Sequence, residues 1–245
     1  MRIAVINLQS GIGITKSYRE YFTSGWRYLL PHSAKYVREA GRLLKQEVVD
    51  IALMTEVEEQ GLRSGFRRQT EMLKSSSELP SATFFPTRSA EPFAAEGNAL
   101  LTHYAVEDVQ THLLRDGSIP RVMGETVLSI DGRRVHVFVA HLGIRHVYRA
   151  DQIQRIHRII TERNEPVILG GDFNERDHEA FEILKTAGFS HLATLPTYPS
   201  WKPKHRLSVL FLSKHFAEPV VSIPEGKPFS DHLPLMVETT LESLP

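Results

Sequence analysis

The chain has 245 residues, and its 29 lysines and arginines balance its 29 aspartates and glutamates, so the formal net charge is zero. It contains no cysteine, which excludes disulfides, thiolate nucleophiles and zinc or iron–sulfur sites built on cysteine. A neutral total argues against a protein that coats nucleic acid by bulk electrostatics, although a local basic groove stays open. Any metal ion must therefore be held by oxygen or nitrogen ligands.

The composition, with 41% apolar and 24% charged residues, is that of an ordinary globular protein. Layered α/β folds often reach about 250 residues as one unit, so we expect a single domain over residues 1–245. The first residues lack the apolar stretch of a signal peptide, and no segment approaches the length of a membrane span. These features predict a cytoplasmic monomer with no membrane partner.

Short runs rich in Val, Ile and Leu predict buried strands, because each run is bounded by polar residues, Gly or Pro. The runs are 2–8, 48–54, 99–102, 122–130, 134–141, 166–169, 208–212 and 233–238. The Asp131-Gly132 pair predicts an antiparallel hairpin between two of them. Apolar spacings of three and four predict helices over 34–48, 152–160 and 180–184, the last ending before Gly188. The two long loops predicted over 10–32 and 75–81 are of the kind that often carry function.

Polar residues fall repeatedly at the ends of the predicted strands. They are Asn7, Glu56, His141, Asp172, Asn174, Asp231 and His232. Each of them alone has an ordinary explanation, such as a turn, a helix cap, a solvated acid or a hydrogen-bonded core histidine. Together they predict one acidic pocket, because ligands of sheet proteins usually bind in the crevice beyond the strand ends.

The motifs around these positions resemble those of the endonuclease/exonuclease/phosphatase superfamily. That group includes pancreatic-type deoxyribonucleases, apurinic endonucleases, neutral sphingomyelinases and inositol polyphosphate 5-phosphatases. The most specific matches are Gly-Asp-Phe-Asn at 171–174 and Ser-Asp-His-Leu-Pro at 230–234. Weaker matches occur at 2–9, 50–56, 97–102 and 136–142, in the family's order. The resemblance implies a four-layered α/β sandwich, with two mixed β-sheets packed face to face and helices outside.

A divalent metal site is the first implication of the resemblance. Position by position, Asn7 and Glu56 match the family's main metal site, and Asp231 matches a further ligand. Oxygen ligands of this kind suit Mg²⁺ or Mn²⁺ better than zinc. The expected cofactor is therefore Mg²⁺ or Mn²⁺.

The remaining four positions match the family's catalytic groups. Asp172 matches the residue that positions or deprotonates the attacking water, and Asn174 matches its partner two residues on. His141 and His232 match two active-site histidines, whose imidazoles can donate to phosphoryl oxygens or to the leaving group. The resemblance thus implies hydrolysis of a phosphate ester by a metal-activated water.

One position departs from the family pattern. Upstream of the last motif the family commonly has Arg-Leu/Ile-Asp-Tyr-Ile-Phe, in which the Asp hydrogen-bonds and orients the histidine of the Asp-His pair. Here the stretch is Arg-Leu-Ser-Val-Leu-Phe at 206–211, so Ser208 replaces that Asp and His232 loses its electrostatic support. Another acid filling the role, an impaired or repurposed enzyme, and an engineered substitution are all compatible with this change. We expect reduced but measurable activity.

Substrate contacts are less clearly marked. The segment 197–206 interleaves aromatic and basic residues, a mixture that can stack a base and hold phosphates or can form an ordinary surface turn. The substrate-binding candidates are Trp201, Lys202, Lys204, Arg206 and, as phosphate clamps, Arg121 and Arg145. We also expect the basic, aromatic segment 10–32 to border the same cleft.

The sequence therefore predicts a divalent-metal-dependent phosphoesterase that hydrolyses phosphodiesters in a nuclease-like way, with DNA or RNA as possible partners. A phosphomonoesterase, or a phosphatase acting on phospholipids or inositol phosphates, is the alternative on the same fold. A third reading is a catalytically impaired protein that binds a phosphate ligand, because Ser208 replaces the usual Asp.

Overall fold

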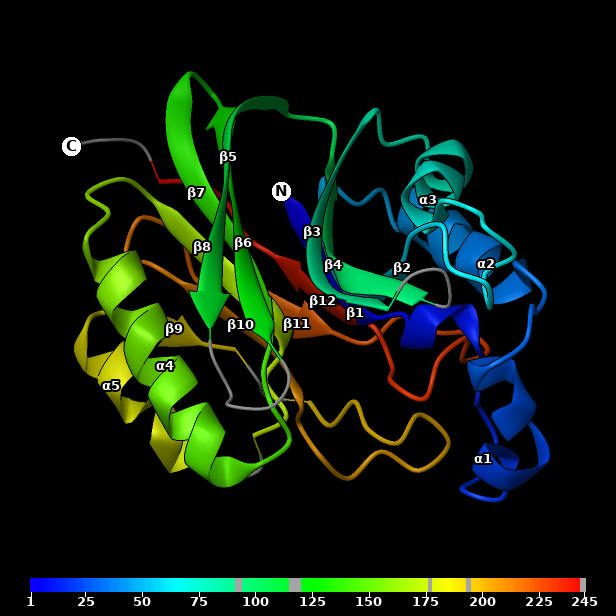
Figure 1. Cartoon of the computed structure of the whole chain (residues 1–245). Coiled ribbons are helices and arrows are strands. Elements are labelled where there is room, and N and C mark those ends of the chain that lie inside the picture. The colour runs from blue at the N-terminus through cyan, green and yellow to red at the C-terminus, as the bar shows by residue number, and fades with distance from the viewer. Residues whose placement is uncertain (91–93, 115–119, 176–177, 193–194, 243–245) are drawn as a thin grey trace.

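The computed structural model describes residues 1–90, 94–114, 120–175, 178–192 and 195–242 (Figure 1). These residues form two six-stranded sheets. The first sheet has the order β11 (Val220–Ser222), β12 (Leu235–Glu238), β1 (Arg2–Asn7), β2 (Ile51–Glu58), β4 (Ala94–Thr102), β3 (Ser81–Ala90). The second has the order β5 (Ala105–Leu114), β6 (Arg121–Ile130), β7 (Arg133–His141), β8 (Val167–Asp172), β10 (Ser208–Leu212), β9 (Ser190–His191).

Each sheet is mixed and has one parallel pair near its middle. In the first sheet β1 and β2 run parallel, and in the second β7 and β8 do so, while the other neighbours are antiparallel. The two parallel pairs therefore place four strand ends, at 7, 58, 141 and 172, where polar side chains can meet. This arrangement positions the candidate site described below.

Three apolar clusters hold the layers together. One fills the space between the sheets, where β1, β2 and β12 face β7, β8 and β10. A second joins the outer face of the first sheet to α2 (Lys35–Gln46) and α3 (Gln69–Ser77), and a third joins the second sheet to α4 (His146–Thr161) and α5 (Glu182–Thr186). The predicted four-layered α/β sandwich is confirmed.

Glycines allow the two sheets to approach closely near the centre. A Cβ added to Gly124 on β6 would lie 2.2 Å from the Phe85 ring on β3, and one added to Gly170 would lie 2.7 Å from Leu53 on β2. Gly171 has φ +145°, and a Cβ there would lie 1.9 Å from the carbonyl oxygen of Ala140. The glycine pair before Asp172 is thus required by packing and backbone shape together.

The predicted hairpin at Asp131-Gly132 joins β6 to β7, with both residues at positive φ, as such a two-residue turn requires.

Each of the eight predicted runs overlaps an observed strand, and their ends differ by at most about five residues. Four strands, β3, β5, β9 and β11, were missed, and the predicted loop at 75–81 is wrong in part because α3 continues to Ser77. The segment 10–32 contains short helical turns: η1 (Gln9–Gly11), α1 (Glu20–Thr23) and η2 (Gly25–Tyr28). One more, η3 (His178–Phe181), precedes α5.

A buried carboxylate ties three strands and the end of α4 together. Glu125 on β6 accepts two hydrogen bonds of 2.9 Å from Arg163 and lies 2.6 Å from ring nitrogens of both His112 and His136. Burial alone would raise the pKa of Glu125, but the hydrogen bonds from Arg163 and the two histidines outweigh it and hold that pKa well below its usual range. The native state therefore prefers the ionised carboxylate.

We expect Glu125→Gln to lower the free energy of unfolding at neutral pH by about 2 kcal/mol, since the arginine and histidines would lose a charged partner. A carboxyl whose native pKa is depressed stabilises the fold above its unfolded pKa of about 4.3, and this contribution is lost as the pH falls. The difference from the parent protein should therefore shrink below about pH 4 in urea unfolding measured over a pH series.

The exposed Glu107 on β5 supplies the control substitution, Glu107→Gln. A difference for Glu125→Gln that did not change with pH would contradict this assignment.

Candidate active site

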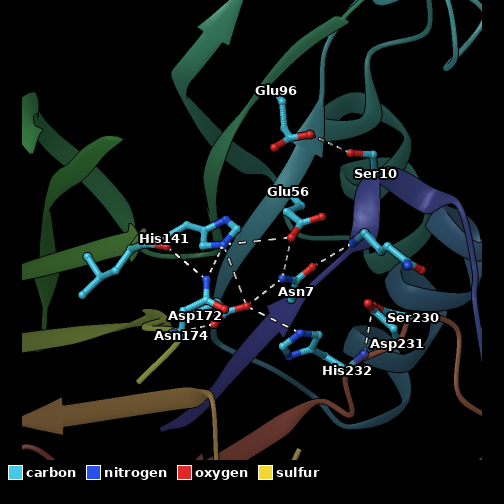
Figure 2. Close-up of polar contacts among 12 residues, drawn as sticks. Asn7, Ser10, Glu56, Glu96, His141, Asp172, Asn174, Ser230, Asp231 and His232 are labelled. Atoms are coloured by element: carbon cyan, nitrogen blue, oxygen red, sulfur yellow. Dashed lines mark hydrogen bonds and ion pairs between the residues drawn. The ribbon is translucent and has the colours of Figure 1, made fainter. Parts of the chain in front are cut away.

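The strand ends converge on one buried carboxylate, that of Asp172 (Figure 2). Asp172 ends β8 directly beside His141 at the end of the parallel strand β7, with which it is in register. Its Oδ2 accepts a 2.8 Å hydrogen bond from Nδ2 of Asn7, which ends β1 in the opposite sheet. The site therefore lies where the central strands of the two sheets meet.

Two imidazoles flank the Asp172 carboxylate. Its Oδ2 is 3.6 Å from Nε2 of His232 and 4.0 Å from Nε2 of His141. Burial would raise the pKa of Asp172, but His232, His141 and the hydrogen bonds from Asn7 and Asn174 outweigh it and lower that pKa below its ordinary value. Asp172 is therefore ionised at neutral pH and can accept a proton.

Glu56 approaches the same centre from an irregular point in β2. The pairing of β2 with β4 shifts register between Met54 and Val57, and Glu56 has φ +53°, an uncommon conformation for a residue with a side chain. Its Oε1 accepts a 3.0 Å hydrogen bond from Asn7 and lies 4.0 Å from Nε2 of His141. The bulge thus turns a carboxylate of a central strand towards Asp172.

The electrostatics of Glu56 show that the centre favours a cation. Burial, followed by the negative charges of Glu96 and Asp231, raises the pKa of Glu56 to about 8. A carboxyl in this state costs energy when it is ionised, and a bound cation removes that cost. The centre is therefore a place where added positive charge is stabilised.

A divalent ion fits the geometry as well as the charge. Ligand atoms of Glu56, His141 and Asp172 all lie within 4.8 Å of one another, close enough to surround one ion. Two carboxylates and one imidazole form an oxygen-rich donor set of the kind that Mg²⁺ and Mn²⁺ accept. The predicted ligand Glu56 belongs to this group, whereas Asn7 directs its amide nitrogen, and not its oxygen, at the carboxylates.

The third predicted metal ligand, Asp231, is held by a residue of the segment 10–32. The Tyr21 hydroxyl of α1 donates a 2.5 Å hydrogen bond to Oδ2 of Asp231, and the Ser230 hydroxyl donates to Oδ1 at 3.2 Å. Burial and the Asp231 charge raise the pKa of Tyr21 far above its usual value, so this hydroxyl remains a donor. The expectation that this segment borders the site is consistent with the Tyr21 contact.

His141 and Asn174 form a fixed pair on the other side of the centre. Nδ2 of Asn174 donates to Nε2 of His141 at 3.0 Å and to the Leu142 carbonyl at 3.0 Å, which together define the amide orientation. Burial and the nearby Arg121 charge lower the pKa of His141 to about 4. His141 is therefore neutral near pH 7, with Nε2 as an acceptor and its proton on Nδ1.

The departure at Ser208 leaves two polar atoms unsatisfied. Ser208 begins β10, opposite Asp172, and its Oγ is buried without a hydrogen-bond partner among the described residues. Nδ1 of His232 is likewise buried and unpartnered within the described part of the chain, although the Tyr198 ring packs against this imidazole at 4.8 Å. The serine therefore does not replace the hydrogen bond that a carboxylate would supply to His232.

The sequence analysis missed two residues near the centre. Glu96 on β4 accepts a hydrogen bond of 2.7 Å from Arg63, which also pairs with the buried Glu58. The Glu96 charge reaches both Glu56 and His141. The only sequence signal for Glu96 was its position directly before the Gly97-Asn98 motif, and Arg63 carried no signal.

The six predicted substrate contacts lie at different depths. Arg121, at the start of β6, is close enough to the centre for its charge to lower the pKa of His141. Arg145 precedes α4 with its guanidinium 5.8 Å from the Tyr148 ring centroid, and Trp201 meets the Tyr18 ring edge-on at 5.1 Å. The other three, which lie exposed on the loop 197–206, are Lys202, Lys204 and Arg206. Substrate binding by these residues stays a prediction.

The comparison with family models decides the classification, because the model of the Endonuclease/Exonuclease/phosphatase family matches residues 7–232. The chain belongs to this family. Its members hydrolyse phosphate esters. The match begins at Asn7 and ends at His232, so it contains all seven residues of the predicted catalytic and metal sites.

A curated relative is similar in sequence, and solved structures share the fold. The uncharacterized protein YbhP of Escherichia coli K12 is 29% identical over 167 residues, which cover 61% of this chain and 65% of YbhP. An endonuclease/exonuclease/phosphatase from Beutenbergia cavernae has a TM-score of 0.74 at 15% identity, covering 99% of this chain and 72% of that one. The mannosyl-6-phosphatase Bt3783 of Bacteroides thetaiotaomicron has a TM-score of 0.72 at 17% identity, covering 98% and 100%. At such identities these structures establish the shared fold.

None of the helices in the described ranges combines the length and apolar character that crossing a bilayer requires.

Proposed function

We propose that the protein is a divalent-metal-dependent phosphodiesterase that uses Mg²⁺ or Mn²⁺. The observation that carries the proposal is the position of the Asp172 carboxylate, between two imidazoles and clustered with Glu56. Phosphate ester hydrolysis requires a base for water, donors for the phosphoryl and leaving oxygens, and neutralisation of negative charge. The residues around Asp172 can meet each requirement.

In this proposal Asp172 accepts the proton of the attacking water, because its lowered pKa keeps it ionised. His232, 3.6 Å from Asp172, donates to the phosphoryl or leaving oxygen. Asn174 fixes His141 in one orientation, in which Nε2 faces the carboxylates of Glu56 and Asp172. A divalent cation held by Glu56 and Asp172, with Asp231 as a further candidate ligand, would supply the charge neutralisation that the phosphate needs.

The charges near the centre favour a diester over a terminal phosphate. Four acids, Glu56, Glu96, Asp172 and Asp231, act on one another there, and the nearby Arg63 is already paired with Glu58 and Glu96. A phosphodiester carries one negative charge near neutral pH, whereas a monoester carries close to two. The diester therefore needs less cationic compensation in this acidic pocket.

A substrate panel tests the proposal. Purified protein with Mg²⁺ or Mn²⁺ should cleave bis-p-nitrophenyl phosphate and one of two DNA substrates, plasmid or abasic-site duplex, faster than p-nitrophenyl phosphate. EDTA should abolish the turnover, and restored Mg²⁺ or Mn²⁺ should recover it. Diester turnover that survives EDTA would refute the metal dependence, and turnover of the monoester alone would favour a phosphomonoesterase. Absence of turnover on every substrate, with metal binding retained, would favour the impaired binding protein.

A further inference from the structure

Large apolar side chains project into solvent beside the candidate active site. Phe22 is 88% exposed, Ile144 78%, Leu29 75% and Val147 72%. Side chains this apolar are rarely displayed together on a soluble surface without a function. They come from two segments far apart in the sequence, the region of α1 and η2 and the turn that begins α4.

Both segments are connected to the candidate active site by hydrogen bonds. On one side, Tyr21 of α1 donates to Asp231, and Tyr18 packs edge-on against Trp201 of the loop 197–206. On the other side, Asn174 donates to the Leu142 carbonyl, two residues before Ile144. Figure 1 shows α1, the loop 197–206 and the first turn of α4 along the same lower edge of the sandwich. We call the residues 16–30, 144–147 and 201–206 the rim.

Hydrogen bonds fix the backbone on both sides of the rim. The Glu20 carboxylate accepts the backbone N–H groups of Thr15 and Lys16 at 2.7 and 2.8 Å, which fixes the entry into α1. The buried Arg149 of α4 donates to the carbonyls of Gly143 and Ile144 and pairs with the buried Glu175. Polar contacts therefore fix the backbone that carries Phe22 on one side and Ile144 on the other.

Basic and aromatic side chains are interspersed with the apolar ones. The basic residues of the rim are Lys16, Arg19, Arg27, Arg145, Lys202, Lys204 and Arg206, with Glu20 as its one acid. Glu20 is already occupied by the two backbone groups of the preceding turn. Trp26 and Tyr18 are half exposed beside these cations, at 50% and 54%. The surface that the rim offers a partner is thus positive as well as apolar.

This combination fits one class of partner best. Nucleic acid would use the cations and the aromatic faces, but it takes aliphatic side chains only as single wedges between base steps, which leaves most of Leu29, Ile144 and Val147 without a partner. A bilayer interface takes all three kinds of side chain at once: aliphatic and Phe tips among the acyl chains, Trp and Tyr at the headgroups, and Lys and Arg against anionic lipid. The rim presents these three kinds of side chain along the edge of the sandwich that the candidate site's neighbours share, as a lipid surface requires.

We propose that the rim docks the protein peripherally on an anionic lipid surface, with the candidate active site facing the headgroups. This departs from the sequence-based expectation of no membrane partner, which rested on the lack of a spanning segment. The docking does not depend on turnover, so it stands or falls separately from the proposed phosphodiesterase activity.

Cosedimentation with vesicles tests the docking. The full chain should bind vesicles made of phosphatidylglycerol and phosphatidylcholine in equal parts, and bind less to pure phosphatidylcholine or at high salt. The double variant Phe22→Ser/Ile144→Ser should bind the anionic vesicles about tenfold or more weakly, because it loses an apolar tip from each side of the rim. Its turnover of bis-p-nitrophenyl phosphate in solution should match that of the parent protein.

A matched control removes apolar surface elsewhere. Val220 on β11 and Val106 on β5 are 67% and 38% exposed and lie outside the rim, so Val220→Ser/Val106→Ser should bind vesicles like the parent protein. Equal vesicle binding by parent and rim variant would overturn the proposal. So would a parent protein that ignores the vesicles but binds single-stranded DNA through the rim, or one whose rim mediates self-association in sedimentation equilibrium without lipid.

Discussion

The Asp172→Asn variant is expected to lose phosphodiester turnover by about a thousandfold while it keeps its fold. The substitution preserves the shape of the side chain but removes the carboxylate that accepts a proton in the proposed mechanism. Asp172 is 2% exposed and its pKa is lowered, so the parent protein carries an ionised carboxylate there near neutral pH. The amide of the variant cannot accept a proton at any pH in this range. The measurement is the rate on bis-p-nitrophenyl phosphate with Mg²⁺ or Mn²⁺.

Two further readouts separate a catalytic effect from a structural one. Asp172→Asn removes one negative charge from a crowded acidic centre, so its thermal midpoint without metal should equal or exceed that of the parent protein. Mn²⁺ binding should weaken, because Asp172 is one of three clustered ligands. The exposed Asp108 on β5 provides the control Asp108→Asn, which should leave the rate unchanged. A variant at Asp172 that retained the parent rate would exclude it as the base.

The pH dependence follows from the same charges. Asp172 stays ionised well into the acidic range and His141 is neutral above about pH 4. Neither group therefore limits the proposed reaction between pH 5 and 8, the ordinary titration range of histidine. Glu56 is the assigned group that titrates in this range, because burial and the neighbouring acids raise its pKa to about 8, so turnover with metal should rise with pH near neutrality.

The sequence predicted the centre of the fold because burial leaves a strong pattern there. β1, β7 and β10 are nearly all buried and mostly apolar, and a polar residue ends or begins each of them, in Asn7, His141 and Ser208. β5 carried no such pattern, since its residues are exposed along most of its length and offer no alternation. Edge strands of this kind are fixed by their neighbours, which local sequence does not reveal.

The candidate site was predictable where motifs mark it and unpredictable where it is completed by distant contacts. The hydrogen bond from Tyr21 to Asp231 joins residues 210 positions apart, and the role of Glu96 depends on Arg63 in a separate loop. The bulge that turns Glu56 inwards is a property of the pairing between β2 and β4. None of these follows from spacing along the chain, because each depends on how strands from different parts of the sequence meet.

The Ser208→Asp variant is expected to hydrolyse diesters faster than the parent protein, by about tenfold to a hundredfold, the size of effect known for groups that orient a catalytic ligand. Nδ1 of His232 is buried without a partner among the described residues, and so is Oγ of Ser208. The family pattern places a carboxylate at this position to orient the histidine, and Asp at 208 would restore it. The gain should be greatest at the alkaline end of the profile, because a neighbouring carboxylate favours the protonated imidazole.

The variant Ser208→Asn separates orientation from charge. An amide at 208 can accept the Nδ1–H of His232 and hold the ring, yet it adds no negative charge beside Asp172, which faces position 208 across the β8 and β10 pairing. If orientation alone limits the enzyme, both variants should accelerate it equally; if charge matters, only Ser208→Asp should extend activity to higher pH. Either gain must vanish when His232→Gln is added, since the proposed benefit acts through that imidazole. Equal rates for the parent protein and both variants at every pH would show that position 208 does not limit His232, and that the proton donor to the leaving group lies elsewhere in the centre.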